Sequence, residues 1–217
     1  MKLNKKKVFA LALAVCLLAI LSVGSLAWFS ASDSVKNDFL IADSQHGTED
    51  AIFSVDVWEK SPDSAEDTDG YEYADILPNA MLVKEPHVEN TGYYDQYVRV
   101  IVTFSDVKAW KAVIGENADL LSTLCAGYDA AMWTDITTIP DQTADTLTYV
   151  LYYDGILESG KDITVFTHFH VPASMTQKQA EAFAGGFTVD VKAQAVQTEH
   201  VGDNAFEAFQ TVNMPIQ

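Results

Sequence analysis

Two histidines separated by one residue, His168 and His170, are the first candidates for metal chemistry in this sequence. Alternate residues of a strand point to the same face, so the two imidazoles would lie side by side as zinc ligands can. A third and a fourth ligand are not evident, although His87, His200 or a carboxylate could be brought in by folding. Because this ligand set is incomplete, the sequence favours the alternative of two solvent-facing histidines.

The second candidate is an acidic stretch, DTDG at residues 67–70, which resembles the middle of a calcium-binding loop. An EF-hand with this glycine at its sixth position would begin at Ala65 and end at Ile76, and neither side chain can bind calcium. The spacing therefore excludes an EF-hand. A looser calcium site that uses Asp67 and Asp69 is the remaining alternative.

Motifs of known catalytic sites are absent from the sequence. It contains no His-Glu-x-x-His zinc helix, no Gly-x-Ser-x-Gly elbow and no glycine-rich phosphate loop. We therefore expect no catalytic residues, no cofactor and no enzymatic activity. The net charge of −18 repels nucleic acid, which we do not expect as a partner.

Strands are the elements that would position these residues, because apolar and polar residues alternate along most of the chain. Helical patterns occur only in connections, at residues 107–114 with Asp106 as cap, at 120–125, and after a capping box of Thr176 and Gln179. The predicted fold is all-β, a jelly-roll-type β-sandwich with short helices in the connections. Its predicted core contains Val98, Val100, Val102, Leu147, Tyr149, Leu151, Val189 and Val191, with Tyr97, Arg99 and Thr103 on the opposite face of their strand.

The N-terminus has the composition of a secretory signal peptide. Four lysines precede an apolar run at residues 8–23, and Ser25 and Ala27 are small residues at the positions that a signal peptidase recognises. We expect cleavage after residue 27, which makes Trp28 the first residue of the mature protein. The alternative is an uncleaved membrane anchor, since a span needs about 20 apolar residues.

Cleavage would leave a strongly acidic chain without a disulfide. The leader contains four lysines and no acid, so the net charge becomes 9 − 31 = −22, and Cys125 is the one remaining cysteine. We expect a buried structural role for this thiol. The predicted organisation is a signal peptide at residues 1–27, an N-terminal strand at 28–42 and a β-sandwich domain at 43–217 with an acidic loop at 61–73.

Three groups of residues carry a resemblance to a known family. They are the leader junction GSLAWFS at residues 24–30, followed by Asp33 and NDF at 37–39, the segment KEPHVENTG at 84–92 with YVRV at 97–100, and VKAQAVQ at 191–197. These segments resemble the TasA/camelysin family of proteins exported by Gram-positive bacteria. Members of this family carry a leader that is cut by a dedicated signal peptidase of the SipW type.

The resemblance implies a structural role outside the cell. TasA-like proteins are jelly-roll subunits of biofilm matrix fibres, and relatives occur in spore coats or on the cell surface. We therefore expect a secreted subunit of the extracellular matrix or a surface layer, with self-association, the SipW-type peptidase and possible accessory matrix or anchor proteins as its partners. The alternatives are a metal-dependent hydrolase of the camelysin type, based on His168 and His170, and a non-enzymatic surface binding module.

The resemblance also assigns a role to the N-terminal segment, because the freed N-terminus of a TasA-like subunit adds as a strand to its neighbour. Residues 28–41 alternate in polarity, as such a strand requires. The apolar face of this predicted assembly strand consists of Phe29, Ala31, Val35, Phe39 and Ile41. The alternative is an ordinary edge strand of its own domain.

Overall fold

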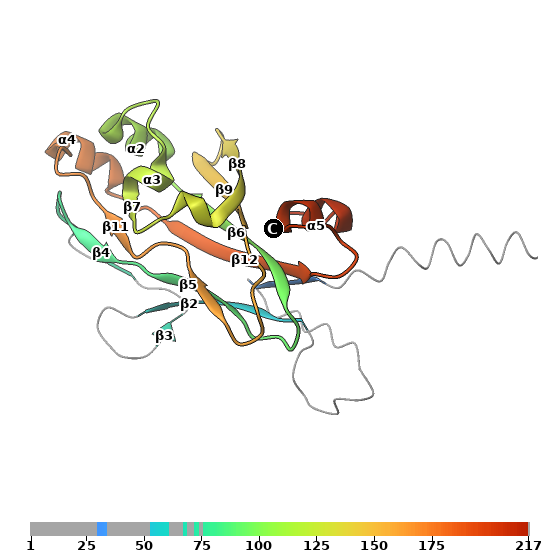
Figure 1. The fold of residues 1–217 in the computed structure, drawn as a ribbon. Helices are drawn as coiled ribbons and strands as arrows, with labels where there is room; N and C mark the ends of the chain where they lie inside the picture. The colour runs from blue at the N-terminus through green and yellow to red at the C-terminus, as the bar shows by residue number, and fades with distance from the viewer. Residues whose placement is uncertain (1–29, 34–52, 61–66, 69–71, 74–75, 217) are drawn as a thin grey trace, which may run out of the picture.

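The computed structural model describes residues 30–33, 53–60, 67–68, 72–73 and 76–216 (Figure 1). These residues form three antiparallel sheets: sheet A with the order β1-β12-β6-β9-β8, sheet B with β10-β5-β2-β3, and sheet C with β4-β11-β7. The strands are β1 (Ser30–Asp33), β2 (Val55–Lys60), β3 (Asp67–Thr68), β4 (Met81–Val83), β5 (Pro86–Asn90), β6 (Gln96–Phe104), β7 (Cys125–Ala126), β8 (Trp133–Asp141), β9 (Thr146–Tyr153), β10 (Asp162–Thr164), β11 (His168–His170) and β12 (Val189–Gln197).

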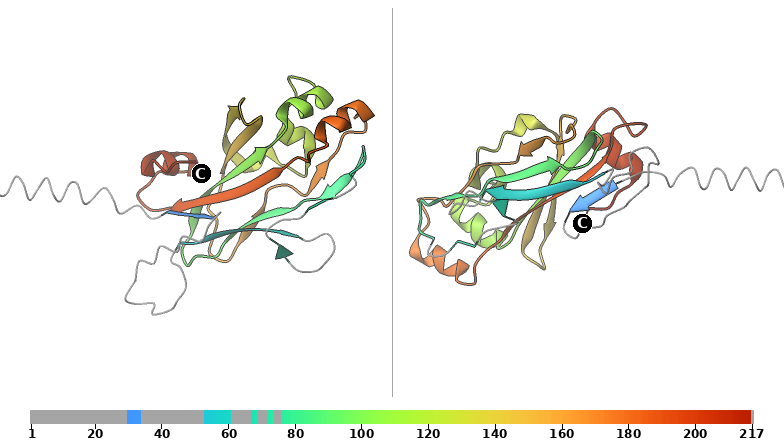
Figure 2. Two further views of the ribbon diagram at one scale, coloured as in Figure 1. Left: turned by 180° about the vertical axis from the view of Figure 1, so that it is seen from behind. Right: turned by 90° about the horizontal axis from the view of Figure 1, so that it is seen from below.

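Short helices occupy the connections between strands. The described helices are α2 (Val107–Ile114), α3 (Leu120–Leu124), α4 (Gln177–Ala180) and α5 (Ala205–Val212), with 3-10 turns at Ala130–Met132 and Glu181–Phe183. Figure 2 shows α2, α3 and α4 gathered at one end of the sandwich and α5 apart from them. The prediction of an all-β sandwich with helices in the connections is confirmed.

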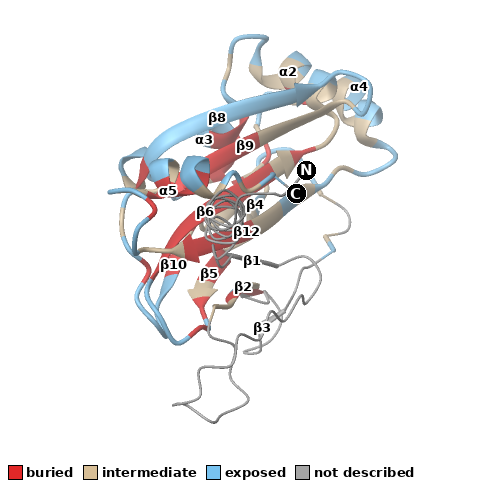
Figure 3. Cartoon of the chain, turned by 90° about the vertical axis from the view of Figure 1, so that its right-hand side faces the viewer, coloured by how far each residue is buried: buried red, intermediate tan, exposed pale blue. Residues whose placement is uncertain are grey.

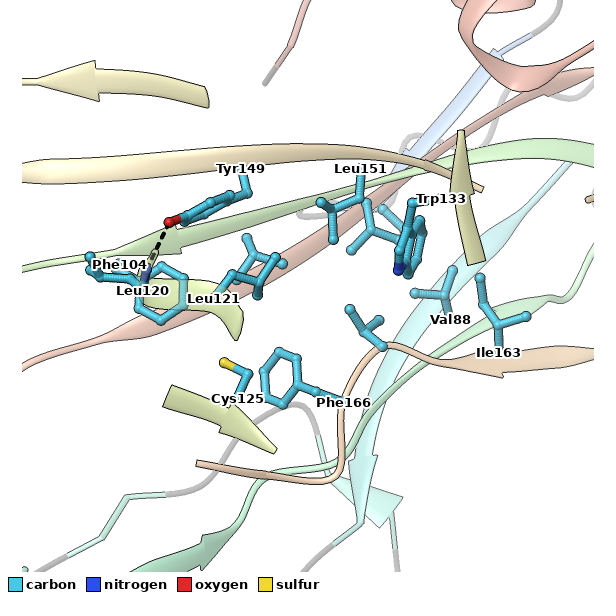
Figure 4. Packing of buried hydrophobic residues seen from close by; sticks show 14 of the residues in the cluster. Val88, Phe104, Leu120, Leu121, Cys125, Trp133, Tyr149, Leu151, Ile163 and Phe166 are labelled. Atoms are coloured by element: carbon cyan, nitrogen blue, oxygen red, sulfur yellow. Dashed lines mark hydrogen bonds between the residues drawn. The ribbon is translucent and has the colours of Figure 1, made fainter. Parts of the chain in front are cut away.

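The core lies between sheet A on one side and sheets B and C on the other. The central strand β6 contributes Val98, Val100, Val102 and Phe104, each with 0% of its surface exposed. Leu121, Cys125 and Phe166 pack beneath sheet A, as Figure 4 shows. The other predicted core residues Leu151 and Tyr149 are buried, whereas Leu147, Val189 and Val191 are half-buried and pack against this cluster.

The outer face of sheet A is also covered, which the sequence did not predict. Tyr97 lies opposite the core side of β6, and it packs with Tyr152 against Ala208 and Phe209 of α5 in a second buried cluster. Arg99 is 2% exposed and its guanidinium lies 4.3 Å from the centre of the Phe209 ring. The C-terminal helix thus gives sheet A two buried faces.

Two predicted helix caps had different outcomes. Thr176 and Gln179 form the expected capping box of α4. Asp106 precedes α2 but makes no side-chain cap hydrogen bond, because its backbone is left-handed with a φ of 55°. The helix ends at Gly115, whose φ of 104° is one that glycine adopts without strain.

Candidate functional site

The N-terminal strand β1 occupies one edge of sheet A. It pairs antiparallel with β12, from Ser30 opposite Val196 to Asp33 opposite Ala193. Residues 30–33 therefore form an edge strand of their own sheet in the single chain. Of the predicted cleavage and assembly residues, Ala31 lies in β1, whereas Ser25, Ala27, Trp28, Phe29, Val35, Phe39 and Ile41 lie outside the described residues.

The described residues of β1 pair with residues 193–196 of β12. β12 has nine residues and β1 has four, so that residues 189–192 of β12 have no strand partner on this side in the described part of the chain. Burial changes at the same point: residues 193–196 are buried, whereas Val189, Val191 and Lys192 are half-buried and Asp190 is exposed. The main-chain donors and acceptors at the edge of a sheet are the groups with which an added strand pairs.

The opposite edge of sheet A, formed by β8, has features that oppose such pairing. Its residues 134–141 are all exposed, as Figure 3 shows along this strand. A bulge lies between Trp133 and Asp135, and Pro140 cannot donate a main-chain hydrogen bond. Bulges, prolines and charged side chains are the usual protection of an edge strand. Sheet A therefore has one protected edge at β8, and at its other edge the N-terminal strand β1 pairs with β12.

The histidine pair predicted as a metal candidate lies on β11. His168 and His170 are both half-buried, and His168 Nδ1 is 3.0 Å from Thr167 Oγ1. Asp67 lies in β3 opposite Lys60, and Asp69 lies outside the described residues. Among the residues that the structure describes, no three His, Cys, Asp or Glu side chains are grouped so as to hold a metal ion.

His87, named above as a possible further ligand beside His168 and His170, is buried in β5. The residue is 7% exposed, and its ring stacks on Trp58 with 4.0 Å between ring centres and an angle of 1°. Nδ1 lies 2.7 Å from Asp162 Oδ2, and Nε2 lies 3.4 Å from Glu85 Oε1. The imidazole therefore links three neighbouring strands of sheet B, namely β2, β5 and β10.

The Asn-x-Gly part of the segment 84–92 has a structural role at the end of β5. The Asn90 amide donates to the carbonyl oxygens of Tyr94 and Leu157 at 2.9 and 2.8 Å. Its oxygen accepts from Gly92 N and Gln96 Nε2 at 2.9 and 2.8 Å. Both donors and both acceptor sites of the buried amide are used, so Asn90 fixes the turn between β5 and β6.

A buried hydroxyl connects α3 to sheet A. Tyr149 Oη donates to Asp119 Oδ1 at 2.8 Å and accepts from Leu120 N at 3.1 Å, the bond drawn in Figure 4. Burial alone would raise the pKa of the Asp119 carboxyl, but hydrogen bonds from Ser122 and Tyr149 outweigh it and lower that pKa. Asp119 also caps α3, since Oδ2 accepts from Ser122 N at 2.8 Å. This contact stabilises the fold.

The Cys125 thiol has the environment of a structural residue. It is 2% exposed, and burial raises its pKa above the usual range of a thiol. The reactive form of cysteine is the thiolate, which a raised pKa disfavours. We therefore assign no chemistry to Cys125.

No protein-family model, no curated protein and no solved structure matches this chain. The described sheets and helices assign the chain to a fold class of their own accord: it is an all-β sandwich with short connecting helices. In the described residues no helix is long and apolar enough to cross a membrane.

Proposed function

We propose that this chain is an exported structural subunit of an extracellular fibre or surface layer, built on a jelly-roll sandwich. The N-terminal segment of one copy, residues 28–42, adds as a strand to β12 of the next copy. The observation that supports this proposal best is the position of β1, which pairs with β12 at the edge of sheet A.

The driving force is the burial of an apolar face. Phe29, Val35, Phe39 and Ile41 are apolar side chains spaced for one face of a strand. Burying a large apolar side chain contributes roughly 1.5 to 3 kcal/mol, so a strand of this kind is stabilised at an open sheet edge. Donation to a neighbour forms a head-to-tail interface between two different surfaces of the same protein. When such contacts do not close into a ring, repeated additions generate a filament.

β12 can pair either with the N-terminal strand of its own chain or with that of a neighbouring copy. Each ladder hydrogen bond between β1 and β12 has a net contribution of about 1 kcal/mol. The same ladder can form with β12 of a neighbouring copy, so an exchange of partner replaces these hydrogen bonds with equivalent ones. Because β8 carries a bulge and Pro140, growth at the β12 edge is favoured and the assembly is polar.

Export controls when the edge is used. The leader at residues 1–27 would hold the N-terminal segment at the membrane until a signal peptidase of the SipW type cuts after Ala27. Cleavage then frees the segment, and the mature protein acts outside the cell, at the surface or in the matrix. We propose no enzymatic role.

Deletion of residues 28–42 tests the proposal. The shortened protein should be a folded monomer that neither polymerises nor joins fibres of the full mature chain. Within the segment, Val35→Asp and Phe39→Asp should weaken assembly more than Ser32→Asp and Ser34→Asp on the polar face. A deleted protein that polymerises as well as the mature chain would rule out strand donation.

A further inference from the structure

Sheet C presents His168, His170 and Met81 on one outward face. In β11 the residue between the histidines, Phe169, is 2% exposed and packs in the main core, so the two imidazoles point to the opposite face. Met81 lies directly opposite His170 in β4, and Leu82 lies opposite Phe169. Leu82 packs against the core as Phe169 does, so Met81 shares the outward face with the imidazoles. Its side chain belongs to a residue that is 52% exposed.

The spacing of these three side chains suits a single ion. Alternate residues of an antiparallel strand are about 6.8 Å apart, and directly opposed residues have Cβ atoms about 4.5 to 5.5 Å apart. The two imidazoles are therefore neighbours along β11, and the Met81 side chain begins beside that of His170 across the ladder. Methionine is unbranched and has three rotatable bonds, so its sulfur can adjust to an ion that the imidazoles hold.

The hydrogen bonds of His168 select the imidazole tautomer that a metal ion needs. The Thr167 hydroxyl donates to the carbonyl oxygen of Ala126 at 3.1 Å, so its oxygen accepts in the 3.0 Å contact with His168 Nδ1. Nδ1 therefore carries the proton, and Nε2 presents its lone pair. A partner of this kind on the second ring nitrogen orients a histidine ligand. Gly127 leaves room for the hydroxyl, since a Cβ atom there would lie 2.5 Å from Thr167 Oγ1.

The chemistry of these donors favours Cu(I). Thioether sulfur is a soft ligand that selects Cu(I), and imidazole also binds copper. Structural zinc sites take four ligands from Cys, His, Asp and Glu, and within the described ranges no third member of that set joins the two histidines. The net charge of −18 favours the approach of a cation.

We propose that His168, His170 and Met81 form a Cu(I) site on the outward face of sheet C, with Thr167 as a positioning residue for His168. The position of Met81 opposite His170 and the chain of hydrogen bonds from His168 to Ala126 carry this inference. The site binds its ion without a reaction of its own. It is separate from the N-terminal strand, because β1 belongs to sheet A, and Figure 1 shows β4, β7 and β11 near the helices α2 to α4.

Competition for Cu(I) with the chelator bicinchoninate tests the site in the full chain. Both cysteines of the sequence are replaced by alanine in every variant, because a thiolate would also bind the ion. This protein should retain one equivalent of Cu(I), and His168→Ala, His170→Ala and Met81→Leu should each lose it. A protein that retains no Cu(I) would overturn the site.

Two matched controls separate the site from general binding by histidine or methionine. Met214→Leu makes the same exchange at a methionine that packs in the cluster beneath α5, and His200→Ala removes an exposed imidazole between β12 and α5. Both variants should retain the equivalent of Cu(I). A Met81→Leu variant that binds Cu(I) as tightly as Met214→Leu would exclude the thioether as a ligand and overturn the proposal.

Silver provides a readout that needs no change at the ligands, since Ag(I) is diamagnetic and has the charge and softness of Cu(I). In protein labelled at its methionine methyl groups and histidine rings, Ag(I) should shift the NMR signals of Met81, His168 and His170 and leave that of Met214 in place. Shifts confined to other methionines or histidines would place the ion elsewhere and overturn the assignment.

The role of Thr167 has its own test. Thr167→Val should weaken Cu(I) binding roughly 10- to 100-fold, as the loss of a hydrogen-bond partner of a metal ligand does. Thr167→Ser keeps the hydroxyl and should restore the affinity, which a purely structural role of the methyl group would not do. Equal affinities of Thr167→Val and Thr167→Ser would contradict the positioning of His168 by this hydroxyl.

Discussion

Replacement of Val100 by aspartate should unfold much of the protein at neutral pH. Val100 is 0% exposed in β6, and its register partners Ala193 and Leu151 are also 0% exposed. The variant loses roughly 1.5 to 3 kcal/mol of apolar burial. It also buries a polar group without a partner, which costs roughly 2 to 7 kcal/mol even when the carboxyl is protonated. The combined loss is comparable with the whole stability of a domain, about 5 to 15 kcal/mol.

The assay is urea unfolding followed by circular dichroism at pH 4 and pH 7. Burial raises the pKa of an introduced carboxyl in the folded state, so the loss should be larger at pH 7 than at pH 4. Ile139→Asp on β8, at a position 41% exposed, is the matched control and should change the stability by about 0.5 kcal/mol or less. A Val100→Asp protein as stable as this control would refute the assignment of β6 to the core.

Three further predictions concern the leader, the histidines and the α3 cap. Ala27→Leu should block processing, and N-terminal sequencing of the wild-type secreted protein should begin at Trp28; a mature protein that begins at residue 1 would contradict this. His168→Ala with His170→Ala should leave folding and assembly unchanged, whereas stoichiometric zinc and a peptidase activity that this variant loses would overturn the prediction. Asp119→Ala should cost about 2 kcal/mol by urea unfolding at pH 7, and Asp119→Asn less, because asparagine still caps α3. Since the pKa of this carboxyl is lowered in the folded protein, its contribution is present above about pH 4 and is lost as the pH falls through the lowered value. A difference between Asp119→Ala and wild type that stays constant down to pH 2 would contradict this assignment.

Alternating polarity predicted the central strands because each of them buries one face in the core. The patterns at residues 96–104 and 146–153 correspond to β6 and β9. The helix predicted at residues 107–114 is α2, whose apolar spacing matches a helical face. The Asp106 cap was wrong, since cap geometry depends on the backbone conformation at that residue and not on residue type alone.

The C-terminal helix α5 was missed, although the sequence contains signals for it. Asn204 accepts a hydrogen bond from Glu207 N as the N-cap, and Phe206 and Phe209 follow at helical spacing. Without α5, the outer face of β6 looks solvent-exposed, because Arg99 on it is polar. Its burial depends on contacts with residues more than 100 positions away, such as the carbonyl oxygen of Met214 at 2.9 Å. Such contacts leave no local pattern in the sequence.

The candidate site was predicted only in part. The alternation of residues 28–41 predicted a strand in this segment, but the partner of residues 30–33 and their register came from the structure. The environment of His87 was equally hidden, since it lies between Glu85 and Glu89 in a pattern typical of an exposed face. Its burial follows from Trp58 and Asp162, which belong to other strands.

The most direct test of strand donation is to free the N-terminus in solution. A purified protein in which a removable soluble domain replaces residues 1–27 would be examined by negative-stain microscopy and sedimentation before and after its release at residue 28. We predict monomers before release and filaments after it, and no filaments from the same protein lacking residues 28–42. Filaments before release, or filaments from the shortened protein, would contradict the assembly of this chain by its N-terminal strand.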